Sequence, residues 1–232
     1  TEFDLTDFLD DEMEIMEVRE DLDTSYESAG WKVVYVMMEP AGTQDEIDDD
    51  FKLLNEMRGL HFDLANNHDV VGGGGVDSSP SYEGPYKVLY DAVDNDVLFG
   101  ERYGLVITNG DLRRGIDSQF DLGAAFANLS ENTSVADPYA GDLWADRVEN
   151  TVHLDGDKIK HIRIEVRVDA STSSETSRVV QWFEDELGEE EDTGKMRSEL
   201  SGIANVYVTG DLVALQNVLD GLNSSQLSST AI

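Results

Sequence analysis

The chain has 232 residues, of which 50 are Asp or Glu and 16 are Lys or Arg, so its formal net charge is -34. Hydrophobic residues make up 40% of the sequence, which is enough to bury a core and excludes a disordered acidic tail. There is no Cys, so disulfides, thiolate metal sites and cysteine nucleophiles are excluded.

Several short segments alternate apolar and polar residues or form apolar runs rich in β-branched residues, and both patterns are typical of strands. In chain order the predicted strands are Met13–Val18, Trp31–Met38, Leu60–Leu64, Tyr86–Tyr90, Tyr103–Thr108, Ile159–Val168 and Ile203–Thr209. The dipeptides Asn109-Gly110 and Asp155-Gly156 predict hairpin turns.

Two segments have apolar residues at helical spacing. Glu175–Leu187 is the first of them, and Asp211–Leu222 is the stronger one, with Asp211 as its predicted cap. The apolar stripe of the second helix includes Leu212, Leu215 and Leu219. This stripe either packs on a sheet or docks a neighbouring subunit, and both alternatives stay open at this stage.

Strands at fairly regular intervals with turns between them predict a mainly β fold, a sandwich or jelly roll, with one or two short helices. We take residues 1–232 as a single domain. Two loop-rich stretches, Asn66–Pro85 and Leu129–Asp142, are long for plain turns and predict functional or inserted loops.

The negative charge is spread from Glu2 to Asp220. A nucleic-acid mimic is one interpretation, but diffuse acid with few lysines favours adaptation to high salt, where the Debye length falls to roughly 3 Å. We therefore expect the fold to be lost when salt is removed. The charge disfavours direct binding to nucleic acid, and no apolar stretch is long enough to span a membrane.

No constellation of catalytic residues stands out. The run Gly72–Gly75 continues into acidic sequence and lacks the lysine of a phosphate-binding loop, and the four histidines lack metal-binding spacing. Carboxylate pairs arise by chance in a chain this acidic, so they carry little evidence for acid–base chemistry. The sequence thus predicts a protein that is no enzyme, with no catalytic residue, metal or cofactor.

Positive charge is concentrated in one place. Lys158, Lys160, Arg163 and Arg167 lie within ten positions, and on a strand with one apolar face they would line the other face. They either pair with the protein's own acids or form a subunit contact with another acidic chain. These four residues, together with Leu212, Leu215 and Leu219, form the predicted subunit interface.

Taken together, the acidity, the absence of Cys and the segments Trp31–Met38, Lys158–Val168 and Asp211–Leu222 resemble the larger major capsid protein of icosahedral, internal-membrane viruses of haloarchaea, which are sphaerolipovirus-like. The resemblance covers the full length. It implies a single upright jelly-roll barrel with an added small β tower, for which the region around 66–142 is the candidate.

The resemblance also implies a location in the virion shell. Copies of the chain would assemble with a second, smaller major capsid protein into pseudo-hexameric capsomers and contact vertex and internal-membrane proteins. Two alternatives stay open: a haloarchaeal secreted or cell-surface β-sandwich binding module, and a halophilic enzyme whose site is hidden by the acidic background.

Overall fold

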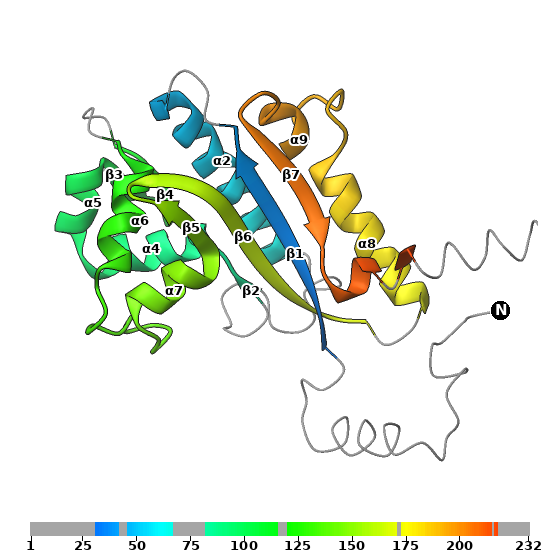
Figure 1. Ribbon diagram of the computed structural model, residues 1–232, viewed down its shortest axis with the longest axis horizontal. Helices are drawn as coiled ribbons and strands as arrows, with labels where there is room; N and C mark the ends of the chain where they lie inside the picture. The colour runs from blue at the N-terminus through cyan, green and yellow to red at the C-terminus, as the bar shows by residue number, and fades with distance from the viewer. Residues whose placement is uncertain are drawn as a thin grey trace, which may run out of the picture.

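The centre of the structure is an open antiparallel sheet of five strands with helices packed on one of its faces (Figure 1). The computed structural model describes residues 31–41, 46–66, 82–115, 120–170, 173–214 and 216–217. Of these, about 50% are helical and 27% lie in strands, and the sheets form no barrel. The expected mainly β jelly roll is therefore wrong.

The strand order of the main sheet is β2-β6-β1-β7, with β5 paired to β6 beside this path. The bounds are β1 Trp31–Pro40, β2 Tyr82–Glu83, β5 Val152–Asp155, β6 Lys158–Asp169 and β7 Ala204–Thr209. The long central strand β1 pairs with β6 on one side and β7 on the other, and every pairing is antiparallel. Three predicted strands, Trp31–Met38, Ile159–Val168 and Ile203–Thr209, are thus confirmed.

Alternation along β1 and β6 gives the sheet one apolar face. Val34, Val36 and Met38 of β1 are fully buried, and so are Ile162 and Val166 of β6. Successive side chains of a strand point to opposite faces, so these residues all face the same helices. Each such side chain contributes about 1.5–3 kcal/mol when it leaves water.

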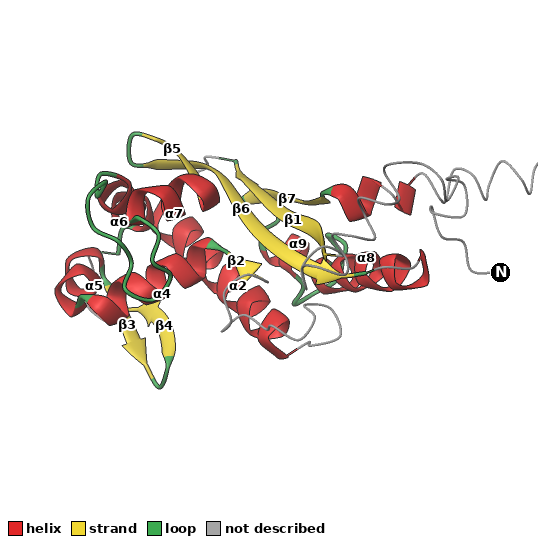
Figure 2. Ribbon diagram, turned by 90° about the horizontal axis from the view of Figure 1, so that it is seen from below, coloured by secondary structure: helices red, strands yellow, loops and turns green. Residues whose placement is uncertain are grey.

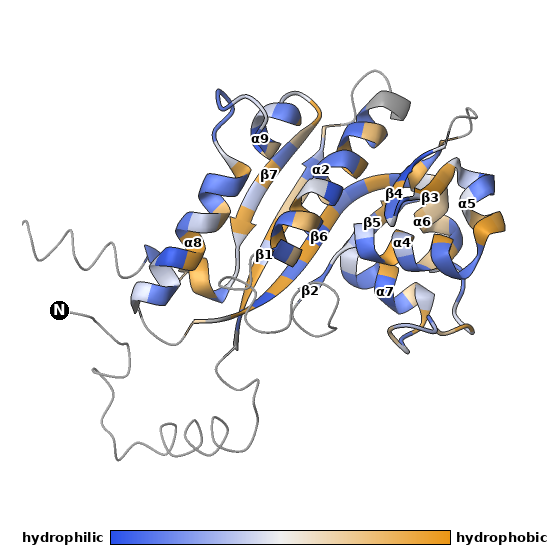
Figure 3. Ribbon diagram, turned by 180° about the vertical axis from the view of Figure 1, so that it is seen from behind, coloured by the Kyte–Doolittle hydropathy of each residue, from blue (hydrophilic) through white to orange (hydrophobic). Residues whose placement is uncertain are grey.

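Three helices cover this apolar face: α2 Glu46–Asn66, α8 Ser173–Leu187 and α9 Met196–Glu199. Figure 3 shows α2 lying across β1 and β6 on the side away from the viewer of Figure 1. The predicted helix over Glu175–Leu187 is confirmed by α8, in which Val179 and Phe183 are fully buried.

The predicted strand Leu60–Leu64 is wrong, because it is part of α2. Over a longer window the buried residues Leu53, Met57, Leu60 and Leu64 recur at spacings of three and four, which is the period of a helix. Five residues are too short to distinguish this period from alternation.

The remaining elements pack at one end of the sheet. They are α4 Pro85–Asn95, α5 Val97–Tyr103, β3 Leu105–Thr108, β4 Asp111–Arg114, α6 Leu122–Ser130 and α7 Trp144–Thr151. Most are helices, and β3 and β4 form a separate two-stranded hairpin, so this part of the 66–142 region is not a β tower. Figure 2 shows these elements gathered at one end of the sheet. Their buried side chains belong to the same core cluster as those of the main sheet.

At this end of the sheet the sequence predicts the turns correctly but predicts one helix as a strand. The predicted strand Tyr86–Tyr90 is wrong, because Pro85 begins helix α4, a position that proline favours. The predicted turn at Asn109-Gly110 is confirmed: both residues have positive φ, 56° and 77°, and connect β3 to β4. The turn at Asp155-Gly156 connects β5 to β6, as expected.

Some predictions fall wholly or partly outside the described residues. The strand Met13–Val18 does so, as do Leu215 and Leu219 of the C-terminal apolar stripe and residues 67–81 of the first long loop. Residues 211–214 and 216–217 are helical, and Leu212 is fully buried in the core.

Candidate functional site

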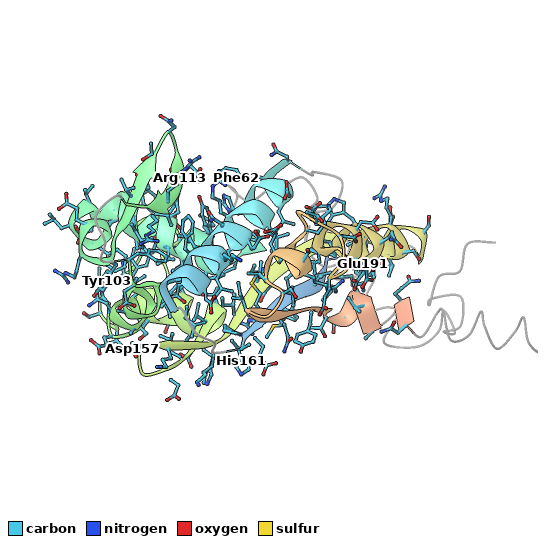
Figure 4. The ribbon with its side chains drawn as sticks, turned by 90° about the horizontal axis from the view of Figure 1, so that it is seen from above. Phe62, Tyr103, Arg113, Asp157, His161 and Glu191 are labelled. Carbon is cyan, nitrogen blue, oxygen red and sulfur yellow. The ribbon has the colours of Figure 1, made fainter. Side chains whose placement is uncertain are left out.

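The face of the main sheet opposite α2, α8 and α9 carries no helix in the described part of the chain, as Figures 1 and 2 show. We call it the open face. Its side chains are those that alternate with the core residues of β1, β6 and β7: Val33, Tyr35, Met37, Glu39, His161, Arg163, Glu165, Arg167, Asn205, Tyr207 and Thr209. In Figure 4, His161 points away from the helices on this side.

The registers of the strands place these side chains in rows across the open face. Met37 lies opposite Arg163 on β6 and Tyr207 on β7, and Tyr35 lies opposite Glu165 and Thr209. The middle strand β1 therefore places Val33, Tyr35 and Met37 along the centre of the face, with polar and charged side chains of β6 on one side and Tyr207 between two polar residues of β7 on the other. Tyr207 is 48% exposed, which is high for a residue of its size and type.

The structure brings two of the predicted interface residues together on this face, Arg163 and Arg167. The guanidinium of Arg163 lies 5.5 Å from the centre of the Tyr35 ring, and its Nε donates to the Asn150 carbonyl oxygen at 2.8 Å. Arg167 Nε lies 3.1 Å from Glu165 Oε1. This exposed pair contributes little to stability, so Arg167 keeps the capacity to bind another carboxylate. Arg163 uses one of its five N–H donors in the bond to Asn150.

The other predicted interface residues lie elsewhere. Lys158 and Lys160 are exposed at the end of the β5–β6 hairpin, where Lys160 Nζ is 3.8 Å from Asp155 Oδ2. Beside them, the rings of His153 and His161 stack at 5.8 Å. Leu212 contributes to the core and presents no surface.

A charged pocket of about 450 Å³ lies at the edge of the open face, where β2 and β6 meet α7. We call it the edge pocket. It is lined by Tyr82, Glu83, Asp142, Arg147, Asn150, Arg163, Glu165 and Arg167. Positive and negative side chains alternate around it, so it suits a ligand surface that carries both signs of charge.

Arg147 is the buried member of the edge pocket, with only 2% of its side chain exposed. Its Nε donates to Glu83 Oε1 at 3.0 Å and its Nη1 donates to Asp91 Oδ2 at 2.8 Å and to Asp137 Oδ2. Its Nη2 has no hydrogen-bond partner among the described residues. A buried guanidinium is tolerable only when carboxylates compensate it, and here three of them do.

Burial also affects the carboxylates around Arg147. It raises the pKa of Glu83 above its ordinary value, and the nearby Arg147 counteracts this only in part. Lys87 Nζ lies 3.2 Å from Asp91 Oδ2, so Asp91 bridges two cations. Arginine stays protonated at neutral pH, so Arg147 holds these carboxylates in position as a permanent cation.

Sequence reasoning missed Arg147 and its carboxylates. One signal could have found it: Trp144, Arg147, Val148 and Thr151 share one face of α7 at helical spacing, and all four are buried. An arginine on an apolar helix face needs buried acidic partners. The positions of those partners, Asp91 and Asp137, carry no such signal, because acidic residues are common throughout this chain.

Comparison of the chain with protein-family models, with curated proteins and with solved structures found no match. In the described part of the chain, no group of three or more His, Asp or Glu side chains is arranged to hold a metal ion. No helix among the described residues combines the length and apolar character needed to cross a bilayer.

Proposed function

We propose that the protein works by assembly: the open face contacts an acidic surface of another copy of this chain. The observation that carries the proposal is the composition of this face. In a chain with 50 Asp and Glu residues, the open face presents Tyr35, Tyr207, Met37, Arg163 and Arg167, and only two acidic residues. Tyr, Met and Arg are the residues enriched in protein interfaces, and Asp, Glu and Lys are depleted there.

Charge complementarity favours a second copy as the partner. Another copy carries 50 acidic and only 16 basic residues, whereas the open face carries two arginines, the exposed Tyr207 and the partly buried Tyr35. The contact would join two different surfaces, and such head-to-tail contacts produce rings or extended assemblies rather than isolated dimers. At molar salt the long-range repulsion between copies is screened, while direct arginine–carboxylate contacts persist.

A capsid shell is one assembly of this kind, and the role in a virion stays a prediction. The fold no longer supports this prediction, because the jelly roll that the resemblance implied is wrong. What supports it is the acidic composition and a contact face that includes Arg163 and Arg167. The smaller partner capsid protein and the vertex and membrane proteins of the virion likewise stay predictions.

Sedimentation velocity of the full chain over a concentration series in molar KCl tests the proposal. The wild-type chain should form large species, whereas the double variant Arg163→Ser/Arg167→Ser should sediment as a monomer with an unchanged circular dichroism spectrum. Tyr207→Ser, which removes an exposed side chain, should weaken assembly in the same direction.

The matched control is Arg102→Ser/Arg178→Ser, which removes two exposed arginines that lie outside the open face. It changes the net charge equally and should assemble as the wild type does. A wild-type chain that stays monomeric at every concentration would refute the proposal. So would a double variant of the open face that assembles normally.

A further inference from the structure

A second pocket lies on the opposite side of the molecule from the open face, between α2 and the β3–β4 hairpin. Its volume is about 260 Å³, and it is lined by Phe51, Asn55, Arg58, Arg113, Arg114 and Gly115. We call it the arginine pocket. Figure 4 shows Arg113 on the hairpin and His161 on the far side of the molecule, so this pocket is separate from the proposed contact surface.

Both walls of the arginine pocket are built by regular structure. Phe51, Asn55 and Arg58 are spaced four and three residues apart on α2, so they share one face of that helix. Arg113 and Arg114 come from the last two positions of β4. Three of the 16 Lys and Arg residues of the chain therefore meet at one cavity, although they are up to 56 positions apart in sequence.

A single buried carboxylate orients two of these arginines. Asp111 accepts from Arg58 Nε at 2.6 Å through one oxygen and from Arg113 Nε at 2.8 Å through the other. Tyr86 Oη donates to Asp111 at 2.8 Å and accepts from the Leu112 amide. Burial acts to raise the pKa of Asp111, but the hydrogen bonds from Arg58, Tyr86 and Arg113 outweigh it and hold the pKa below its ordinary value.

The third arginine, Arg114, lies against two aromatic rings. Arg114 lies 5.8 Å from the centre of the Phe51 ring and 5.6 Å from that of Phe120, and these two rings pack edge to face. No acidic residue is among the described residues that line the arginine pocket. Among the described residues, three guanidinium groups thus meet one compensating carboxylate, which is an excess of positive charge at this place in a strongly acidic protein.

We propose that the arginine pocket binds a phosphate group. Arg58 and Arg113 use part of their fork-shaped donor sets on Asp111, and each guanidinium has five N–H donors, so further donors are available for a ligand. A tetrahedral dianion accepts from several arginines at once and neutralises the excess charge, which a monocarboxylate does less completely. Asn55 adds an uncharged donor at the same cavity.

Titration of the full chain with inorganic phosphate, followed by calorimetry in molar KCl, tests this proposal. A saturable heat is expected for the wild type, and Arg113→Ser should weaken binding by about tenfold or more. Arg113 is suited to the test because 58% of its side chain is exposed, so its loss should leave the fold intact. If that variant fails to fold, Arg113→Lys keeps the charge and should still bind several-fold more weakly than the wild type.

Arg178→Ser is the matched control, since it removes an exposed arginine of α8, outside the pocket, and should leave phosphate binding unchanged. Acetate is titrated separately as a comparison ligand, and it should bind more weakly than phosphate. The proposal is overturned if the wild type shows no saturable heat, if Arg113→Ser binds phosphate as tightly as the wild type, or if acetate binds as tightly as phosphate. The outcome is independent of whether the open face mediates assembly.

Discussion

Arg147 Nη1 lies 2.8 Å from Asp91 Oδ2, although 56 positions separate the two residues in the chain. This bond joins α7 to α4, and the same guanidinium also bonds Glu83 of β2 and Asp137 of the loop before α7. One buried side chain therefore fixes four segments at the edge of the main sheet. The edge pocket takes its shape from this network, and the adjoining open face depends on it for the placement of β2.

Replacing Arg147 with Met should destabilise the protein by about 3–5 kcal/mol, because it leaves buried carboxylates without their cation. Most of this loss should come from Asp137, because its side chain is fully buried and loses its cation. Asp91 still has Lys87 as a partner. Equilibrium denaturation in molar KCl measures the change in the free energy of unfolding.

Two further variants test that interpretation. Arg178→Met removes an exposed arginine and should change stability by less than about 0.5 kcal/mol. Adding Asp137→Asn to Arg147→Met should recover part of the loss, because the amide no longer carries an uncompensated charge. An Arg147→Met variant as stable as the wild type would contradict the assigned role.

Two glycines in helices should respond to alanine in opposite directions. Gly59 lies inside α2, and an added Cβ there meets no atom within 4 Å. Gly59→Ala should therefore stabilise the protein by about 0.4–1 kcal/mol, because alanine restricts the unfolded chain and favours the helix. Gly123 in α6 packs so closely against the Asp157 carbonyl oxygen that a Cβ would clash with it. Gly123→Ala should cost about 1–3 kcal/mol.

Thermal unfolding of the two variants under identical salt conditions checks this pair. For a chain of this size, 1 kcal/mol corresponds to a Tm change of roughly 2–4 °C. Each variant acts as the other's control, since the chemical change is the same. Equal shifts of the same sign would show that the close contact of α6 with the β5–β6 turn is not rigid.

Stability should fall as the pH rises from about 4.5 to about 7, owing to Glu56. The pKa of Glu56 is raised from 4.5 to about 7, chiefly by burial and further by the negative charges of Glu199 and Asp63. Within this range the folded state holds a proton that the unfolded state has released, so folding is progressively disfavoured as the pH rises. Glu56→Gln should remove this contribution and raise the Tm at pH 8 by roughly 2–4 °C.

The control for Glu56 is Glu101→Gln, which neutralises an exposed carboxylate on α5. Removing any negative charge from this chain relieves repulsion, so the diagnostic quantity is the slope of Tm against pH between 5 and 8 rather than its absolute value. Only Glu56→Gln should flatten that slope. Identical slopes for both variants would mean that Glu56 titrates normally in the folded protein.

The correctly predicted elements are those whose pattern is long or chemically specific. The alternation of Ile162, Ile164, Val166 and Val168 extends over a whole strand, and Asn109-Gly110 supplies the positive φ values that its turn requires. The failures are short. The five-residue windows at Leu60–Leu64 and Tyr86–Tyr90 fit both periods, so the sequence predicts strands where the structure has helices. These two strands, together with helices that the sequence does not predict, account for the wrong fold class.

For the candidate sites too, the sequence predicts some features and not others. Arg163 and Arg167 could be placed on one face of a strand from their spacing alone, and the structure places them there. The sequence could not show that no described helix packs on this face, that Arg147 meets Asp91 and Asp137, or that Arg58 meets Arg113 on one carboxylate.

By itself, then, the sequence determined the charge of the molecule, three of the strands of its main sheet, two hairpin turns and the helix α8, because those features depend on composition or on neighbours a few residues apart. Only the tertiary structure decided that the described helices pack on one face of the sheet, and which distant charges share a pocket. Those outcomes depend on how elements far apart in the chain pack together, which local periodicity does not encode.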